Sequence, residues 1–201
     1  MPRRTVYLVD DDEEIVSNIA TYLREKHYEV RQFSRGQDFL SALPLNFPAV
    51  VVLDMQMPGL NGLEIQKALA RQAIKVPIFF LSGDSKSQQI IDAMKQGAYE
   101  FLLKPVMPNV LSGLLNKVFL QQEAFEANNK ELVQNQARLA LLTKYERQSF
   151  NYLVQGFSNK KIAGLLGLQA DTIKKRRAQI YLKLEAADLP ELIKKYGKLD
   201  D

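Results

Sequence analysis

Short apolar segments in the first half of the chain alternate with longer stretches that have the apolar spacing of amphipathic helices. The segments expected to be strands are residues 5–9, 29–33, 50–53, 76–81 and 100–103. Strands that alternate with helices favour a parallel sheet with helices on both faces. Five such units within about 120 residues fit a small, doubly wound α/β domain.

Unusual polar residues fall at the expected carboxyl ends of these strands. Asp10 and Asp11 follow the first strand, Asp54 ends the third, Ser82 the fourth, and Lys104 follows the fifth. Each residue alone has an ordinary interpretation, as a helix cap, a turn residue or a surface lysine. Their coincidence at four strand ends is a more specific signal, because ligands of doubly wound sheets bind at this edge.

Convergence of the strand ends would crowd Asp10, Asp11 and Asp54 into one cleft. Like charges at close range are unfavourable unless a cation lies among them. With oxygen ligands alone the expected cation is hard, and Mg²⁺ is the best candidate. A carboxylate beside Mg²⁺ and a lysine is arranged for phosphoryl transfer, with one aspartate as the nucleophile that becomes an acyl phosphate. The hydroxyl of Ser82 can bond a phosphoryl oxygen.

The net charge of +4 is unevenly distributed. Residues 1–120 contain 13 basic and 13 acidic side chains, whereas residues 141–184 contain nine basic and two acidic ones, a net charge of +7. A neutral front part and a compact basic segment indicate two roles, the second one near a polyanion.

Composition excludes several other classes of site and protein. The chain has no cysteine and one histidine, so disulfides, iron–sulfur clusters and thiolate zinc sites are excluded, and a Ser-His triad is disfavoured. No apolar run approaches the roughly 18 residues of a membrane span. We therefore expect a cytoplasmic protein with no membrane partner.

Residues 108–142 are predicted to form one long helix with a single apolar stripe. Apolar side chains recur there every seven residues, at Leu111, Val118, Phe125, Leu132 and Leu139. A strong coiled coil has two apolar positions per heptad, and here the second is often Asn or Gln. The stripe fits either a weak dimer seam that sets the register or a solvated linker helix.

The basic tail is expected to form several short helices. Thr143 and Glu146 have the spacing of a capping box at the start of the first. Ser158 opens a second helix and Gly167 ends it, and a third begins near Ala170. The third helix is expected to face inward with Ile173, Ile180 and Leu184. Two helices joined at a glycine-containing turn are typical of a helix-turn-helix.

The front part resembles the receiver domain of two-component response regulators from residue 4 to about residue 120. The resemblance is carried by residues 9–12 (VDDD), 54–62 (DMQMPGLNG), 82–83 (SG) and 104–105 (KP). It implies a flavodoxin-like, five-stranded fold. It also implies that Asp54 is the phospho-acceptor and that Mg²⁺ is held by Asp11, Asp54 and the backbone carbonyl of Gln56, with Asp10 acting through water.

The resemblance further implies that Lys104 pairs with the phosphoryl group and that Ser82 and Phe101 occupy the hydroxyl and aromatic switch positions. Serine replaces the commoner threonine, which keeps the hydroxyl. Tyr99 is the other aromatic candidate, but the spacing to Lys104 favours Phe101. Phosphorylation adds about −1.5 to −2 charges, which would draw Ser82 inward and let Phe101 fill the vacated space.

This switch would alter the face made by a helix at about residues 85–96, the fifth strand and the helix after it. In the family this face dimerises. The candidate contact residues in the 85–96 helix are Ile90, Ile91 and Met94.

Residues from about 140 to 196 resemble the LuxR-type helix-turn-helix through residues 142–147 (LTKYER), 156–163 (GFSNKKIA) and 172–184 (TIKKRRAQIYLKL). Together with the receiver, the chain is most similar to the FixJ branch of the NarL/FixJ regulators. Arg176 stands where the family often has histidine, which affects the site sequence rather than binding itself.

The third helix of the tail would lie in the major groove as the recognition helix. The candidates for base edges are Lys174, Lys175 and Gln179. The candidates for phosphates are Lys160, Thr172, Arg176 and Arg177. Sequence does not separate these two classes firmly, and Arg177 can instead run along the domain core.

We therefore expect a receiver domain at residues 1–120, a linker helix at 121–141 and a helix-turn-helix domain at 142–201. The resemblance implies a phosphorylation-dependent transcription factor rather than an enzyme, since a receiver catalyses only its own phosphorylation and dephosphorylation. The implied cofactor is Mg²⁺. The implied partners are a sensor histidine kinase, double-stranded promoter DNA and a second copy on phosphorylation, with RNA polymerase as a further candidate.

Two other hypotheses stay open. A haloacid-dehalogenase-like phosphatase also forms an aspartyl phosphate, although such enzymes place Asp-x-Asp after the first strand and do not need a basic tail. Alternatively, the chain is a constitutive DNA-binding regulator whose receiver is a dimerisation module alone.

Overall fold

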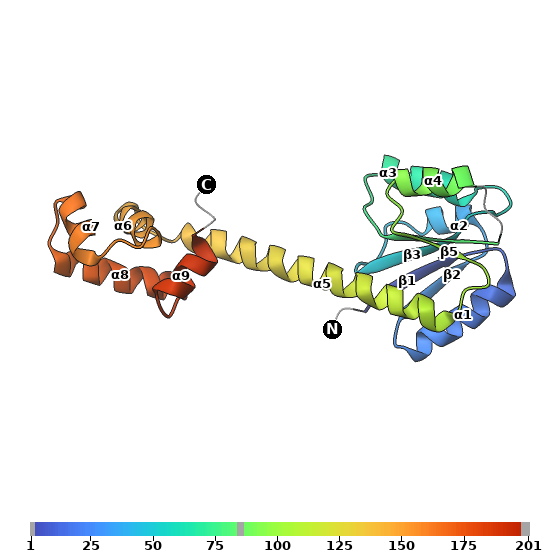
Figure 1. The fold of residues 1–201 in the computed structure, drawn as a ribbon, viewed down its shortest axis with the longest axis horizontal. Helices are drawn as coiled ribbons and strands as arrows, with labels where there is room; N and C mark the ends of the chain where they lie inside the picture. The colour runs from blue at the N-terminus through green and yellow to red at the C-terminus, as the bar shows by residue number, and fades with distance from the viewer. Residues whose placement is uncertain (1–2, 84–86, 198–201) are drawn as a thin grey trace. The chain divides into compact units, whose positions relative to one another are not determined.

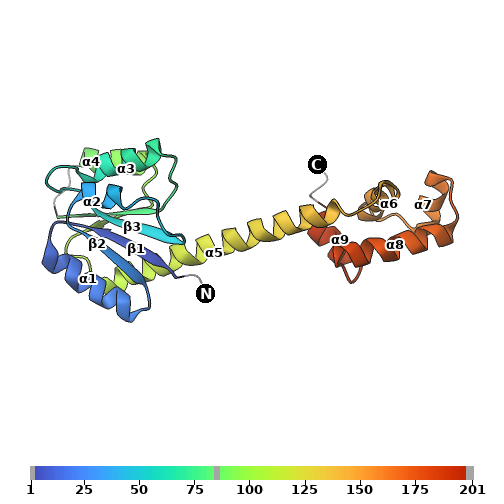
Figure 2. The same cartoon turned by 180° about the vertical axis from the view of Figure 1, so that it is seen from behind.

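The computed structural model describes residues 3–83 and 87–197, which fall into two compact units, Met1–Ala124 and Phe125–Asp201 (Figures 1 and 2). The outer ends of the expected domains, at residues 1–2 and 198–201, lie outside the described residues. The same holds for the expected helix start at about Ser85. The two units are considered separately below.

The first unit is built on a parallel sheet. Its strands are β1 (Thr5–Val9), β2 (Glu29–Phe33), β3 (Ala49–Asp54), β4 (Ile78–Ser82) and β5 (Glu100–Leu103). They are ordered β2-β1-β3-β4-β5, and every neighbouring pair is parallel. The structure therefore confirms the predicted doubly wound α/β sheet.

Two of the five strands differ from their predicted bounds. β3 is longer by one residue at each end than the expected 50–53. β4 begins at Ile78 instead of residue 76, because Pro77 has no backbone N–H to donate to the ladder. The Pro77 carbonyl still accepts a hydrogen bond from the Val51 N–H at 3.0 Å.

Helices cover both faces of the sheet. They are α1 (Glu13–Glu25), α2 (Gly36–Ser41), α3 (Gly62–Arg71), α4 (Ser87–Lys95) and the start of α5 (Pro108–Leu139). Alternate residues of a strand point to opposite faces: Val6 belongs to a core with α1 and α5, and Tyr7 to one with α2, α3 and α4. Figure 1 shows the same two layers.

The three consecutive acidic residues after β1, Asp10, Asp11 and Asp12, have different roles. The Asp12 side chain caps α1 by accepting hydrogen bonds from the N–H groups of Glu14 and Ile15, each at 3.1 Å. Because Asp12 caps α1, the carboxylates of Asp10 and Asp11 are not needed for capping.

The turn after β3 depends on Gly62, the first residue of α3. A Cβ atom at this position would lie 2.6 Å from the Asp54 carbonyl oxygen and 2.8 Å from the Phe80 ring. Asn61 and Glu64 form a capping box at the same helix start. The missing side chain thus allows α3 to begin directly against the end of β3.

The predicted long helix is α5, which ends at Leu139, three residues earlier than expected. The apolar side chains that recur every seven residues along α5 lie in different environments. Leu111 and Val118 are buried in the core of the first unit, and Leu139 is buried in that of the second. Phe125 and Leu132 are exposed, by 66% and 45%. Two positions of the stripe are therefore exposed, and its role as a dimer seam stays a prediction.

The second unit is helical. After the end of α5 it contains α6 (Lys144–Val154), α7 (Asn159–Leu166), α8 (Ala170–Leu184) and α9 (Leu189–Tyr196). The predicted capping box between Thr143 and Glu146 is present, and the Ser158 side chain caps α7. Gly167 ends α7 with the left-handed φ of 66° that favours glycine. The three residues predicted to face inward from α8 are fully buried: Ile173, Ile180 and Leu184.

Candidate functional site

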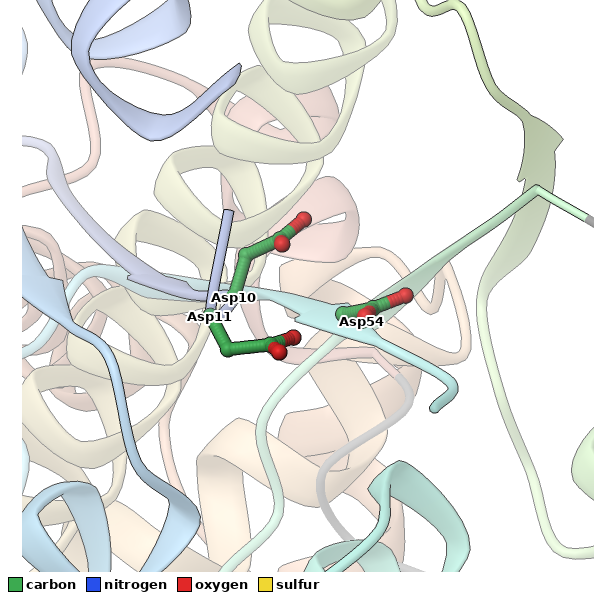
Figure 3. Close-up of side chains that lie close together, drawn as sticks. All are labelled: Asp10, Asp11 and Asp54. Carbon is green, nitrogen blue, oxygen red and sulfur yellow. The ribbon is translucent and has the colours of Figure 1, made fainter. Parts of the chain in front are cut away.

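Three carboxylates meet at the carboxyl edge of the sheet (Figure 3). Val9 of β1 pairs with Leu53 of β3, so Asp10, directly after β1, lies beside Asp54, the last residue of the adjacent β3. Together with Asp11 they offer oxygen atoms that all lie within 4.8 Å of one another. Asp10 and Asp54 are buried and Asp11 is exposed, which opens the cluster to solvent on one side.

Lys104 completes this cluster from the end of β5. Its backbone N–H donates to the Ser82 carbonyl at 2.8 Å, which places the side chain beside the acids. The Lys104 Nζ atom lies 2.8 Å from Asp10 Oδ2 and 3.3 Å from Asp54 Oδ1. We call Asp10, Asp11, Asp54 and Lys104 the acidic pocket.

Burial and like charge disfavour the ionised form of Asp54. Burial raises the pKa of the Asp54 carboxyl, and the charge of Asp10 raises it further. The ammonium of Lys104 and a hydrogen bond from the Gln56 backbone act in the opposite direction. Burial lowers the pKa of Lys104, but its hydrogen bond to Asp10 and the charges of both aspartates outweigh burial and raise it. The neighbouring carboxylates thus raise the pKa of both groups.

The donor set fits a hard divalent cation. Three carboxylates facing one ammonium leave an excess of two negative charges, which a divalent ion would neutralise, and all donors are oxygen atoms. These residues are the predicted metal ligands Asp10, Asp11 and Asp54. The predicted fourth ligand, the carbonyl of Gln56, follows Asp54 by two residues and stays a prediction.

The expected switch residues lie next to the acidic pocket. Ser82 is buried at the end of β4, the strand between β3 and β5. Phe101 is half-buried in β5 and packs with the core on the side of α4. Tyr99 packs with the opposite core, and its hydroxyl donates to Gln121 Oε1 at 3.0 Å. The two aromatic candidates therefore face different layers, and only Phe101 faces that of α4.

The sequence analysis overlooked residues that follow β2. Ser34 lines a hollow beside Asp10, together with Glu13 of α1, and Ser34 and Arg35 line a second hollow beside Asp11. The sequence contains a signal for these residues, since Ser34 and Arg35 directly follow β2, whose carboxyl end lies at the same edge of the sheet as the acidic pocket. β2 is polar and only partly buried, so its sequence, like that of residues 100–103, is a weaker strand signal than the other three segments.

In the second unit, the residues predicted to contact DNA fall into two groups. One group is exposed: Lys160 on α7 and Lys174, Lys175 and Gln179 on α8. On α8 these side chains lie away from the buried positions that pack the domain. The predicted base contacts therefore share a solvent-facing surface of one helix, and Thr172 is half-buried near its start.

The second group, Arg176 and Arg177, is half-buried and makes contacts within the domain. Arg176 lies over the Tyr145 ring at 5.2 Å, and its guanidinium donates to the Tyr145 carbonyl and to Ser149 Oγ, both at 3.4 Å. Arg177 donates to the Tyr181 hydroxyl at 2.8 Å and to Asn159 Oδ1 at 3.3 Å. These contacts link α8 to α6 and α7. Phosphate contact by either arginine would have to use its remaining N–H donors.

Each of the two structural units matches a known protein family. Residues 6–116 match the response regulator receiver domain, and residues 140–196 match the luxR family of bacterial regulatory proteins. The chain therefore belongs to the response regulators that join a receiver domain to a LuxR-type DNA-binding domain. This family consists of regulators rather than typical enzymes.

Relatives cover nearly the whole chain. The transcriptional regulatory protein FixJ of Bradyrhizobium diazoefficiens is 34% identical over 200 residues, which span 98% of this chain and 97% of the relative. The tetrathionate response regulatory protein TtrR of Salmonella typhimurium is 31% identical, over 97% of this chain and 93% of its own. With such relatives, the chain is a transcriptional response regulator of the FixJ type.

Solved structures support the same assignment. The response regulator StyR matches with a TM-score of 0.78 at 31% identity, covering 98% of this chain and 99% of its own. Full-length FixJ from B. japonicum matches with a TM-score of 0.60 at 30% identity, covering 97% of this chain and 96% of its own.

Within residues 3–83 and 87–197, no helix has the length and hydropathy needed to span a membrane.

Proposed function

We propose that Asp54 is the phospho-acceptor of this regulator and that a sensor histidine kinase is its donor. The observation that carries the proposal is the position of the Asp54 carboxylate, beside Lys104 and two further carboxylates at the open edge of the sheet. An Asp54 oxygen would attack the phosphorus of a phosphohistidine, forming a P–O bond while the P–N bond breaks. The imidazole nitrogen would leave with the bonding electrons.

The other residues of the acidic pocket would support this transfer. Lys104 would pair with a phosphoryl oxygen, since its ammonium already lies within 3.3 Å of Asp54. Asp11, Asp54 and the Gln56 carbonyl would hold Mg²⁺, with Asp10 acting through water. When bound, Mg²⁺ would supply positive charge that offsets the negative phosphoryl oxygens.

Phosphorylation would then act on the face made by α4, β5 and α5. The Ser82 hydroxyl would turn toward the phosphoryl group, and Phe101 would follow it inward. This face carries large apolar side chains that are exposed in the described residues: Ile91, Met94, Leu103, Met107 and Val110. Ile90, the third predicted contact in α4, is half-buried. A second copy covering these side chains is the expected dimer.

The dimer would place two α8 helices on promoter DNA. Lys174, Lys175 and Gln179 are the proposed base contacts, because they share the exposed surface of α8. Lys160 and Thr172 are the proposed phosphate contacts. For Arg176 and Arg177 we propose mainly a bracing role, given their contacts to α6 and α7. The exposed Phe125 and Leu132 of α5 would add a short dimer seam.

Labelling with a small phosphodonor tests the acceptor. The chain is incubated with acetyl phosphate and Mg²⁺, and its intact mass is recorded. Asp54→Asn should abolish the added phosphoryl mass, whereas the control Asp38→Asn, at an exposed position in α2, should be labelled like the unmodified chain. Full labelling of Asp54→Asn would refute the assignment.

A second measurement separates this function from constitutive DNA binding. DNA affinity is compared with and without acetyl phosphate for the unmodified chain and for Asp54→Asn. We expect the phosphodonor to tighten binding in the first and to leave the second unchanged. Equal affinity in all four conditions would favour a receiver that is a dimerisation module alone.

A further inference from the structure

The hollow beside Asp11 adjoins the acidic pocket, because Asp11 belongs to both. It has a volume of about 680 Å³ and is lined by Asp11, by residues 34–37 after β2 and by residues 58–60 after β3. Asp11 is the exposed member of the acidic pocket, whereas Asp10 and Asp54 are buried. The solvent-facing side of the acidic pocket therefore borders this hollow. We call it the Asp11 hollow.

Arg35 is the one basic residue among the described residues that line the Asp11 hollow. Its side chain is exposed, and its guanidinium has no hydrogen-bond or ion-pair partner within residues 3–83 and 87–197. Asp11 lines the same hollow, yet the two side chains form no ion pair. The long, unpaired side chain of Arg35 is thus available to an anion that enters the hollow.

The local structure does not favour an arginine at this position. Arg35 is the N-cap residue of α2, and its side chain makes no capping hydrogen bond. Serine, threonine, aspartate and asparagine are preferred at an N-cap, because their side chains accept hydrogen bonds from the free N–H groups. A positive charge at the start of a helix is also unfavourable. The helix itself gives no reason for an arginine here, which favours a role in binding.

The chemistry at Asp54 produces an anion on the open side of the acidic pocket. The attacking oxygen and the leaving group lie roughly in line on opposite sides of the phosphorus, so attack by the buried Asp54 directs the leaving group outward. With an acyl phosphate, the new P–O bond forms while the P–O bond to the carboxylate breaks, and the carboxylate leaves with the bonding electrons and a negative charge. With phosphoramidate the P–N bond breaks instead, and neutral ammonia leaves.

We propose that Arg35 determines which phosphodonors the receiver prefers, by pairing with the carboxylate that leaves from an acyl phosphate. Guanidinium and carboxylate form two parallel N–H···O hydrogen bonds, and the negative charge of the carboxylate develops during the transfer. Neutral ammonia gains nothing from the same guanidinium. The inference rests on the proposed phosphorylation of Asp54 and adds a specificity-determining residue outside the acidic pocket.

Two phosphodonors with different leaving groups test the proposal. The full chain and its variant Arg35→Ser are incubated with Mg²⁺ and either acetyl phosphate or phosphoramidate, and the rate of labelling at Asp54 is followed by mass spectrometry. About 0.5 M salt is present, because it screens the long-range attraction of any anionic donor. Serine is a favoured N-cap, so the variant should remain folded. We expect Arg35→Ser to slow labelling by acetyl phosphate about fivefold and to change labelling by phosphoramidate less than about twofold.

Two further variants complete the experiment. Arg71→Ser removes the same charge from the exposed last residue of α3, which does not line the Asp11 hollow, and should behave like the unmodified chain with both donors. Arg35→Lys keeps the charge without the planar pair of donors and should label at an intermediate rate with acetyl phosphate. Equal slowing of both donors in Arg35→Ser, or no slowing of either, would overturn the proposal. Absence of labelling at Asp54 in the unmodified chain would instead overturn the proposed function on which it rests.

Discussion

The ammonium of Lys104 lies closer to Asp10 than to Asp54, at 2.8 Å against 3.3 Å. Asp10 is almost fully buried, and its other oxygen accepts a hydrogen bond from the Asp12 N–H at 3.0 Å. Asp10 therefore holds the lysine at the edge of the acidic pocket, within reach of Asp54. The lysine in turn offsets the repulsion between two buried carboxylates.

Removing this ammonium should destabilise the receiver in a way that magnesium relieves. Lys104→Gln leaves Asp10 and Asp54 facing each other without a cation, and loss of one partner of a buried ion pair costs about 3 kcal/mol or more. Thermal unfolding in the presence of a chelator should show a lower midpoint for this variant. Mg²⁺ should raise that midpoint by more than it raises that of the unmodified chain.

The control for this experiment is Lys67→Gln, at an exposed position of α3, which should behave like the unmodified chain with and without Mg²⁺. An equal Mg²⁺ response in Lys104→Gln and Lys67→Gln would contradict the role given to the lysine.

A pair of glycine substitutions tests the turn that carries Asp54. Gly62→Ala places a Cβ atom 2.6 Å from the Asp54 carbonyl oxygen, so it should cost about 1–3 kcal/mol of stability and slow labelling of Asp54. Gly113→Ala, in α5, meets nothing within 4 Å and should stabilise the chain by about 0.5–1 kcal/mol. Denaturant unfolding measures both values. Similar effects of the two substitutions would show that close packing at Gly62 is unimportant.

The pairing of α6 with α8 should depend on pH through Glu146. Burial raises the pKa of Glu146, but hydrogen bonds from Lys183, at 2.6 Å, and Thr143 outweigh burial and lower it below 4.5. A carboxyl whose pKa is lowered in the folded state stabilises that state above its unfolded pKa and loses this contribution as pH falls through the folded pKa.

Hydrogen-exchange protection of the α6 and α8 amides should therefore be constant from pH 7 to about pH 5 and fall below about pH 4.5. Glu146→Gln should lower protection at pH 7 and flatten this dependence. Glu131→Gln, at an exposed position of α5, is the control and should change neither. The same pH profile in both variants would exclude the ion pair as its cause.

The proposed phosphate contacts and the proposed base contacts should differ in how their loss changes the dependence of DNA affinity on salt and on sequence. Duplexes are first selected by the unmodified chain from a random pool, and binding is then measured at several salt concentrations. Lys160→Ala, a proposed phosphate contact, should weaken all duplexes evenly and reduce the salt slope by about 1. Lys174→Ala, a proposed base contact, should cost about 1–3 kcal/mol and relax the preference at one position.

Lys117→Ala, at an exposed position of the receiver unit, serves as the control and should leave affinity and slope unchanged. If Lys174→Ala weakened all sequences equally, it would belong with the phosphate contacts.

Much of this architecture could be predicted because each part has a local signal. The apolar segments gave five parallel strands, and the strand-end rule brought Asp10, Asp54 and Lys104 together. The capping box at Thr143 and the break at Gly167 lay where their side chains predicted. These features depend on short-range chemistry that one sequence contains.

Other features depend on tertiary contacts that no local pattern contains. The basic character of Arg176 and Arg177 suggested phosphate contacts, but the acceptors that bind them come from α6, α7 and α8 itself. Similarly, the seven-residue stripe of α5 looked uniform, yet its ends serve two separate cores. Distant packing partners determine these environments, and phosphate contact by Arg176 and Arg177 stays a prediction.

The most direct test of the central claim is to locate the phosphoryl group. After incubation with acetyl phosphate and Mg²⁺, the chain is reduced with borohydride, which converts an aspartyl phosphate to homoserine, and its peptides are sequenced by mass spectrometry. The account predicts homoserine at position 54 and nowhere else among the aspartates. Homoserine at position 10 or 11, or unmodified Asp54 in a fully treated chain, would contradict it.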